Sequence, residues 1–246
     1  MTSRAPSLTR SLFAAALILV LPMATRAETV TQSASYDIVM KGFTVATLGF
    51  TGTEDGGQYE VKGKLASAGL VAFLKKISYD ASASGAVASG RYTPSRYSEK
   101  ADTGKRVSEA VMEYKSGVPQ LKVYSPPRPP KPQDVDPATQ GGTVDPLTAL
   151  FATMRDAEPG QECDRVLNMF DGKRASRLTL GKPQSSDGTI TCAGEYRRIA
   201  GFTAEDMAEK SRFPFTLTYA AGPDGKMQVV EVAMDSLYGR ARMVRR

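Results

Sequence analysis

The stretch Met227-Gln-Val-Val-Glu-Val-Ala-Met234, which follows the turn sequence Pro223-Asp224-Gly225, carries the residue pattern that decides the fold class. Successive side chains of a β-strand point to opposite faces of the sheet. The stretch therefore divides into two sets, with Val230, Val232 and Met234 on one face and Val229, Glu231 and Ala233 on the other. A second stretch repeats the alternation, with Leu178 and Leu180 against Arg177 and Thr179. This pattern predicts a sheet with one face in solvent.

Four turn sequences typical of hairpins lie between segments with alternating or β-branched residues. They are Asp55-Gly56-Gly57, Asp171-Gly172-Lys173, Ser186-Asp187-Gly188 and Pro223-Asp224-Gly225. Successive hairpins make successive strands antiparallel. The sequence therefore predicts a mainly β protein, built as a single curved antiparallel sheet or as an open β-barrel or spiral, with two or three short helices.

Helix signals are few. Asp145 has the character of an N-cap with Pro146 at the first helical position, and apolar residues follow at helical spacing. Thr203-Ala-Glu-Asp206 resembles a capping box with Asp in place of Glu and predicts a second short helix. A third segment, Ser67–Leu74, fits a helix and a bulged strand equally well.

The N-terminus has the features of an export signal. Arg4 and Arg10 precede an apolar run that begins at Leu12, and a small residue, Ala27, stands before a plausible cleavage point. The apolar run is shorter than the ~20 residues that span a bilayer, and no cysteine stands near the cut. We therefore expect residues 1–27 to be a signal peptide cleaved after Ala27. Residues 28–246 are then expected to form a single β-rich domain in the periplasm.

Cys163 and Cys192 are the two cysteines of the chain. An isolated pair in an oxidising compartment is most simply a disulfide. Two thiols cannot complete a zinc site, and the chain has no Cys-x-x-Cys redox motif. We expect the two residues to be bonded to each other.

The net positive charge of the chain is too small to indicate a nucleic-acid-binding protein. Loss of Arg4, Arg10 and Arg26 with the predicted signal would lower the formal net charge by three, from +6 to +3. The basic cluster is the tail, residues 240–246. It is either a terminal strand in solvent or a peripheral contact to anionic lipid or cell-wall polymer.

The residues for most catalytic chemistry are missing. The chain has no histidine, the commonest general base and metal ligand, and no nucleophile elbow. Ser98 and Lys100 are close in sequence, but such a pair is common by chance. We therefore predict no catalytic, cofactor-binding or metal-binding residues and no cofactor. Acidic clusters leave a cell-wall hydrolase as the least favoured alternative, and tryptophan, a usual sugar platform, is absent; the clusters are Glu205, Asp206 and Glu209, and Asp134 and Asp136.

A proline-rich segment, Ser-Pro-Pro-Arg-Pro-Pro-Lys-Pro from Ser125, opens a loop at about residues 125–144. Prolines at this density favour an extended conformation and cannot lie in a central strand. The loop is either a surface connection between two β segments or a docking motif for an aromatic groove.

A series of different short motifs occurs along nearly all of the chain after residue 27. They are Tyr36-Asp-Ile38 with Gly42 and Gly49, Gly90-Arg-Tyr-Thr-Pro94-Ser-Arg-Tyr97, Asp145-Pro-Leu-Thr-Ala-Leu150, Asp171-Gly-Lys-Arg174, Cys192–Tyr196 with Ile199, Gly201 and Phe202, and Pro214-Phe215-Thr-Leu217. Together they resemble the bacterial envelope proteins of domain of unknown function family 3108. The resemblance implies a periplasmic protein with an open, curved β-sheet related to the half-barrels of the lipoprotein carriers LolA and LolB. It implies no catalytic residues.

A curved sheet covered by a helix can hold an apolar ligand between its concave face and the helix. The candidate lining residues, which either line such a cavity or fill a core, are Phe43, Val45, Leu48, Phe50, Leu70, Phe73, Leu150, Phe151 and Met154. We expect a non-catalytic cell-envelope protein that binds or chaperones an apolar component, such as a lipid or a lipoprotein. The alternative is an envelope-integrity scaffold that contacts other periplasmic proteins.

Overall fold

A computed structural model describes residues 29–74 and 76–246. Within them, thirteen strands form one antiparallel sheet, accompanied by three short α-helices and a 3-10 turn. The strands are β1 (Val30–Met40), β2 (Phe43–Asp55), β3 (Gln58–Ser67), β4 (Ser78–Ala88), β5 (Arg91–Asp102), β6 (Val107–Lys115), β7 (Val118–Ser125), β8 (Arg165–Phe170), β9 (Ala175–Ser186), β10 (Thr189–Ala200), β11 (Arg212–Ala221), β12 (Met227–Ser236) and β13 (Gly239–Arg245). The helical elements are α1 (Gly69–Leu74), η1 (Pro137–Thr139), α2 (Pro146–Met154) and α3 (Ala204–Glu209). The predicted mainly β fold is confirmed.

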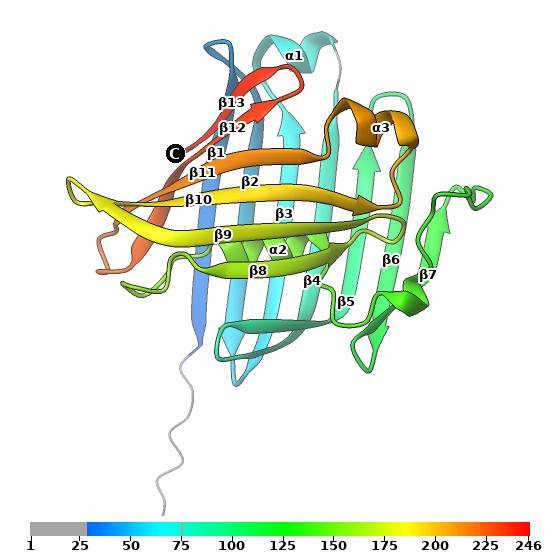
Figure 1. Ribbon diagram of the computed structural model, residues 1–246, viewed down its shortest axis with the longest axis horizontal. Coiled ribbons are helices and arrows are strands. Elements are labelled where there is room, and N and C mark those ends of the chain that lie inside the picture. Colours follow the sequence, from blue (N-terminus) through cyan, green and yellow to red (C-terminus); the bar gives the residue numbers. More distant parts are fainter. Residues whose placement is uncertain (1–28, 75) are drawn as a thin grey trace, which may run out of the picture.

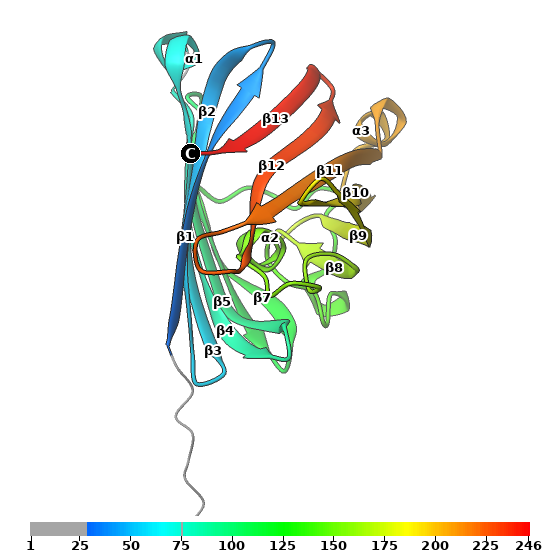
Figure 2. The same cartoon turned by 90° about the vertical axis from the view of Figure 1, so that its left-hand side faces the viewer.

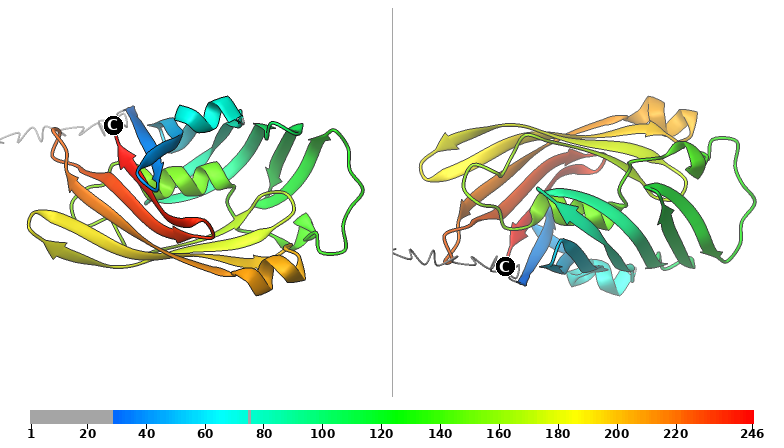
Figure 3. Two further views of the ribbon diagram at one scale, coloured as in Figure 1. Left: turned by 90° about the horizontal axis from the view of Figure 1, so that it is seen from above. Right: turned by 90° about the horizontal axis from the view of Figure 1, so that it is seen from below.

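The strand order shows how one sheet makes two walls. Strands β1 to β7 follow one another as the N-terminal wall, strands β8 to β13 as the C-terminal wall, and β1 pairs with β13 at the seam. The walls fold toward each other, and their strands cross at a steep angle (Figures 1 and 2). The far strands, β7 and β8, do not pair, so the structure is an open barrel rather than a closed one. Views from above and below place α2 between the two walls (Figure 3).

The four predicted hairpin turns are confirmed. Each joins neighbouring strands, in order β2–β3, β8–β9, β9–β10 and β11–β12. Gly56 and Gly57 both have positive φ, as does Gly188 after Asp187, a conformation that L side chains rarely adopt. The turn residues therefore set the local hairpins, and the hairpins set the meander.

Helix α2 lies inside the barrel because nearly all of its surface is apolar. The Asp145 side chain accepts a hydrogen bond from the backbone N–H of Thr148 at 2.8 Å, as the predicted cap requires. Seven of the nine helical residues are buried, and Leu150 is half-buried. A helix that is apolar on all sides needs cover on all sides, and the two walls supply it.

Two glycines let α2 approach the N-terminal wall closely. A Cβ built on Gly52 of β2 would lie 2.2 Å from the Phe151 ring, and one on Gly63 of β3 would lie 2.6 Å from Leu147. Such distances are far below van der Waals contact, so no other residue fits at either position without movement. The missing side chains on the sheet make room for the helix.

The predicted division of the Met227–Met234 stretch is wrong at its start. A β-bulge places Val230 opposite no residue of β11, because Thr218 pairs with Glu231 and Tyr219 with Val229. Val229 is fully buried, whereas Val230 is only half-buried. An extra residue in one strand reverses which side chains face the core.

The remaining local predictions have clear outcomes. Ser67–Leu74 contains a helix, α1, at residues 69–74 rather than a bulged strand through its length. Thr203 and Asp206 form the predicted capping box at the start of α3. Cys163 and Cys192 are disulfide-bonded, which ties the segment before β8 to β10. The predicted signal peptide, residues 1–27, lies outside the described residues. No helix within the described ranges is long and apolar enough to cross a membrane.

Candidate functional site

An apolar cavity of about 590 Å³ lies between α2 and the inner face of the C-terminal wall. Strands β9 to β13 and β1 provide most of its surface. Its lining residues are Ile38, Leu150, Thr153, Met154, Arg174, Leu178, Tyr196, Arg198, Phe202, Phe213, Phe215, Leu217, Val232, Met234, Ala241 and Met243. The surface of the cavity is overwhelmingly carbon, with two guanidinium groups as its cationic part.

Helix α2 contributes the cavity's inner side through Leu150, Thr153 and Met154. The Thr153 hydroxyl donates to the Ala149 carbonyl at 2.7 Å, so it offers the cavity no free donor. Tyr219, fully buried in β11, donates its hydroxyl to the Thr153 carbonyl at 2.9 Å. The helix is thereby fixed to the C-terminal wall beside the cavity.

Cations and aromatic rings alternate along one part of the lining. The guanidinium of Arg174 lies 5.3 Å from the Phe202 ring centre, and that of Arg198 lies 5.2 Å from Phe202 and 5.1 Å from Phe213. The Lys210 ammonium lies 5.1 Å from the Phe213 centre. These contacts hold the rings of Phe202 and Phe213 against the cavity.

The two arginines differ in how free they are to meet a ligand. Arg198 is half-buried, and its Nη1 donates to the carbonyls of Asp206 and, at 2.9 Å, Lys210. The Arg174 guanidinium is exposed and makes no hydrogen bond or ion pair with any described residue. Arg198 therefore organises the α3 connection, while Arg174 presents its donors at the rim.

The candidate lining residues separate into three groups in the structure. Leu150 and Met154 line the cavity. Phe50 and Phe151 lie in the core between α2 and the N-terminal wall, with ring centres 5.8 Å apart, and Leu48 is also buried. A third group is far more exposed: Phe43 at 67%, Leu70 at 73% and Phe73 at 90%. Phe43, Val45 and Leu70 border a different hollow beside α1.

Sequence reasoning missed the aromatic side of the cavity. Phe213, Phe215 and Leu217 alternate along β11 and all line it. That alternation is visible in the sequence and predicts a shared strand face. The gathering of β11 with Phe202 and Ile38 is not visible, because it depends on pairing between distant strands.

Three buried polar side chains, Asp145, Thr148 and Tyr59, form a hydrogen-bonded group at the start of α2. Burial raises the pKa of Asp145 to about 6, although hydrogen bonds from Thr148 oppose the shift. The Thr148 hydroxyl donates to Asp145 at 2.7 Å and lies 2.8 Å from the Tyr59 hydroxyl. Burial also raises the pKa of Tyr59 well above its ordinary value. The group closes the start of α2 against the N-terminal wall and does not line the cavity.

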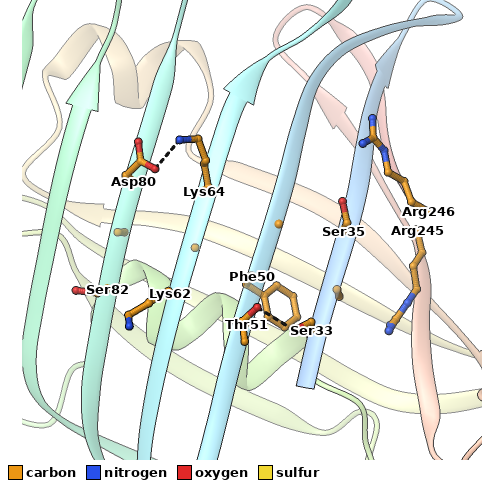
Figure 4. Close-up of a pocket in the computed structure, with 14 residues that line it drawn as sticks. Ser33, Ser35, Phe50, Thr51, Lys62, Lys64, Asp80, Ser82, Arg245 and Arg246 are labelled. Atoms are coloured by element: carbon orange, nitrogen blue, oxygen red, sulfur yellow. Dashed lines mark hydrogen bonds and ion pairs between the residues drawn. The ribbon is translucent and has the colours of Figure 1, made fainter. Parts of the chain in front are cut away.

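A larger hollow, about 890 Å³, lies on the outer face of the N-terminal wall (Figure 4). Gly49 and Gly63 are among its lining residues, and Figure 4 shows α2 behind the strands. Lys64 pairs with Asp80 at 2.9 Å, and the hydroxyls of Ser33 and Thr51 lie 2.8 Å apart. Its charged side chains all have ionic partners, within the hollow or beside it, on an open surface, which makes it a weaker ligand site than the cavity.

The groups considered for catalysis have structural partners. The hydroxyls of Ser98 and Ser82 lie 2.9 Å apart, while Lys100 lies 3.5 Å from Glu109. Asp206 accepts hydrogen bonds in the α3 capping box. Within residues 29–74 and 76–246, no group of three acidic, histidine or cysteine side chains could hold a metal ion.

The proline-rich loop packs against both walls, at the β6–β7 turn and at the β8–β9 turn. Arg128 and Asp134 form an ion pair at 2.9 Å inside it, and the Val135 N–H donates to the Lys173 carbonyl. The Lys173 ammonium lies 3.4 Å from the centre of the Tyr124 ring, at the end of β7. These contacts agree with a packed surface connection.

Comparisons with known proteins found similarity to a family model and to a solved structure. A family model described as "Protein of unknown function (DUF3108)" matches residues 35–244. A crystal structure titled as a beta-barrel-like protein of domain of unknown function DUF1849 from Brucella abortus is similar, with a TM-score of 0.48 and 14% identity over 87% of this chain and 95% of that one. No curated protein matches the sequence.

Proposed function

This chain belongs to the DUF3108 family of proteins of unknown function, and we propose that it is a non-catalytic cell-envelope protein that binds an apolar ligand between α2 and the C-terminal wall. The family assignment confirms the resemblance found in the sequence. The relation to the carriers LolA and LolB stays a prediction.

The observation that carries the proposal is the cavity itself. Small-molecule sites are concave, mostly apolar and about 300–1,000 Å³ in volume. The cavity has about 590 Å³, and aromatic and aliphatic side chains make up most of its lining.

The chemistry of the lining favours an amphiphile with an acyl chain. The apolar interior matches a hydrocarbon chain. Each methylene group that such a chain buries there would make binding more favourable by about 0.8 kcal/mol. Arg174 at the rim has unused donors that would meet a carboxylate or phosphate. Fatty acids and phospholipids have both groups, whereas the acylated end of a lipoprotein has the acyl chains without the anionic group.

Location in the envelope is supported by two features. Residues 1–27 have the pattern of a signal peptide, and Cys163 and Cys192 form a disulfide of the kind that persists in oxidising compartments. A non-catalytic role agrees with the structural partners of Ser98 and Lys100 and with the lack of histidine.

Uptake of a fluorescent fatty acid tests the proposal. Leu150→Asn places an amide on the cavity side of α2, and Ala241→Trp fills the cavity from β13. Both variants should weaken uptake by about tenfold or more, because Leu150→Asn replaces an apolar contact with the acyl chain and Ala241→Trp takes the space that the acyl chain would occupy. Leu70→Asn changes an exposed leucine on α1 and should bind like wild type.

Circular dichroism must first show that each variant is folded. Ala241→Trp is the stricter test, because it adds apolar surface and lowers uptake only if the ligand occupies that space. A wild type that takes up no fatty acid or phospholipid, or two folded variants that bind as wild type does, would favour the envelope scaffold.

A further inference from the structure

Helix α1 presents its apolar side to solvent. Leu70, Phe73 and Leu74 lie at helical spacing on one face, with exposed fractions of 73%, 90% and 88%. Val71 and Ala72, by contrast, are half-buried. A helix that only capped the sheet would turn its largest apolar side chains inward, so this outward face calls for a partner.

Two hairpin turns bring further exposed rings to the same place. Phe43 follows the β1–β2 turn and is 67% exposed, and Tyr238 lies in the β12–β13 turn and is 78% exposed. Phe43, Leu70 and Tyr238 border one hollow. Figures 1 and 2 show α1 and both turns at the same end of the molecule. We name Phe43, Leu70, Phe73, Leu74 and Tyr238 the apolar tip.

The three segments that carry the apolar tip contain positive charges and no negative ones, although Asp235 borders one of them. The segments that form it, residues 40–45, 68–77 and 236–241, contain lysine and arginine and no acidic residue. Lys41 in the β1–β2 turn and Lys76 after α1 are exposed. Arg240 is also exposed, but it lies opposite Asp235 in the β12–β13 pair, so we take Lys41 and Lys76 as the cations of the described tip segments that meet a partner.

We infer that the apolar tip docks the protein on the surface of a bilayer that contains anionic phospholipid. Aromatic and aliphatic side chains that project from a helix and two turns enter the boundary between headgroups and acyl chains, while nearby lysines contact anionic headgroups. The basic tail does not form this site, because β13 is paired on both sides and Arg246 is bound to Asp37 at 2.6 Å.

Docking at the tip would bring the cavity close to the membrane. Ile38 of β1 lines the cavity, and Met40, two residues further on, borders the hollow under the tip. Residues two apart in a strand lie about 7 Å apart and face the same side. Membrane docking goes beyond the proposed ligand binding and does not depend on it, since the tip shares no lining residue with the cavity.

A single tryptophan reports insertion directly, because the chain contains none. Phe73→Trp puts the reporter on the tip, and Val166→Trp puts it at a site on β8 that is 63% exposed and outside the tip. Vesicles of phosphatidylglycerol and phosphatidylethanolamine in equal parts should shift the fluorescence emission of Phe73→Trp to shorter wavelength. The emission of Val166→Trp should not change.

Sedimentation with the same vesicles measures affinity. The double variant Phe73→Ser, Leu74→Ser should reduce partitioning by at least about tenfold, and Lys41→Glu, Lys76→Glu should reduce it comparably. Val166→Ser is the matched control and should partition as wild type does. All of these positions are exposed, so the variants should keep the circular dichroism spectrum and the cavity's fatty-acid uptake.

Three results would overturn the inference. One is a wild type that stays in the supernatant with anionic vesicles, and another is a double serine variant that partitions like wild type. The third is a wild type that forms a dimer by light scattering where the serine variant is a monomer, since the tip would then bind a second copy of the chain.

Discussion

The ring of Phe151 lies directly over the backbone of Gly52, in space that a side chain at residue 52 would need. A Cβ at that position would lie 2.2 Å from Cε2 of Phe151. Phe151 is 1% exposed and also meets the rings of Phe50 and Tyr92, each with a centre 5.8 Å away. This contact fixes the distance between α2 and the N-terminal wall, and so leaves the cavity on the other side of the helix.

Gly52→Ala should therefore destabilise the protein by about 1–3 kcal/mol, since the buried ring has little room to move. Gly49→Ala on the same strand is the control, because its nearest neighbour, the Ala34 carbonyl oxygen, would be 3.7 Å away. Urea unfolding of both variants measures the difference. Equal midpoints would show that Phe151 can shift freely.

The disulfide should contribute substantially to stability. It closes a separation of 29 residues between Cys163 and Cys192, which the chain-entropy description values at about 3–4 kcal/mol. Cys163→Ser with Cys192→Ser should lower the free energy of unfolding by that amount and leave fatty-acid uptake by folded protein intact. Peptide mapping without reductant should recover the linked pair from the native protein, whereas free thiols would contradict the structure.

Asp145 should make stability depend on pH. Its pKa rises from an ordinary 3.8 to about 6 in the folded state, so the unfolded chain releases this proton first as pH increases. The stability linked to this group is complete below about pH 4 and is lost as pH rises through about 6.

Asp145→Asn tests this dependence, because asparagine also caps helices but does not ionise. From about pH 5 to about pH 7.5, wild type should lose about 1 kcal/mol of unfolding free energy relative to the variant. Urea titrations of both proteins at the two pH values give the comparison. A difference that does not change with pH, or that grows in favour of wild type, would refute the raised pKa.

The predicted signal peptide has a direct test. Protein purified from the periplasm should begin at Glu28, because the n-region, the apolar run and the small residue Ala27 match the pattern of a cleaved leader. N-terminal sequencing decides the point. An intact Met1 form retained in the inner membrane would show that the segment anchors the protein.

Features with local causes could be predicted from the sequence. Asp145 and Thr203 cap their helices through side chains that bond to the next turn, so each motif carries its own structure. The hairpin turns are local in the same sense. The bulge at Val230 has no such signature, because it arises where β12 pairs with β11.

The cavity depends on contacts that are distant in sequence. The pairing of β1 with β13 joins the ends of the described chain and curves the sheet around α2. Hydrophobicity alone did not distinguish Phe151 in the core from Leu150 in the cavity or Phe73 on the surface. Only the assembled walls separate these three environments.

The native mass spectrum of the purified protein tests the central claim most directly. Wild type should retain a bound lipid-sized mass that gentle activation removes and that solvent extraction identifies as an acyl-chain compound. Folded Ala241→Trp should show the mass of the protein alone, because its new ring occupies the cavity. A wild type without bound mass after incubation with several lipid classes, or a folded Ala241→Trp with the same adduct as wild type, would contradict ligand binding in this cavity.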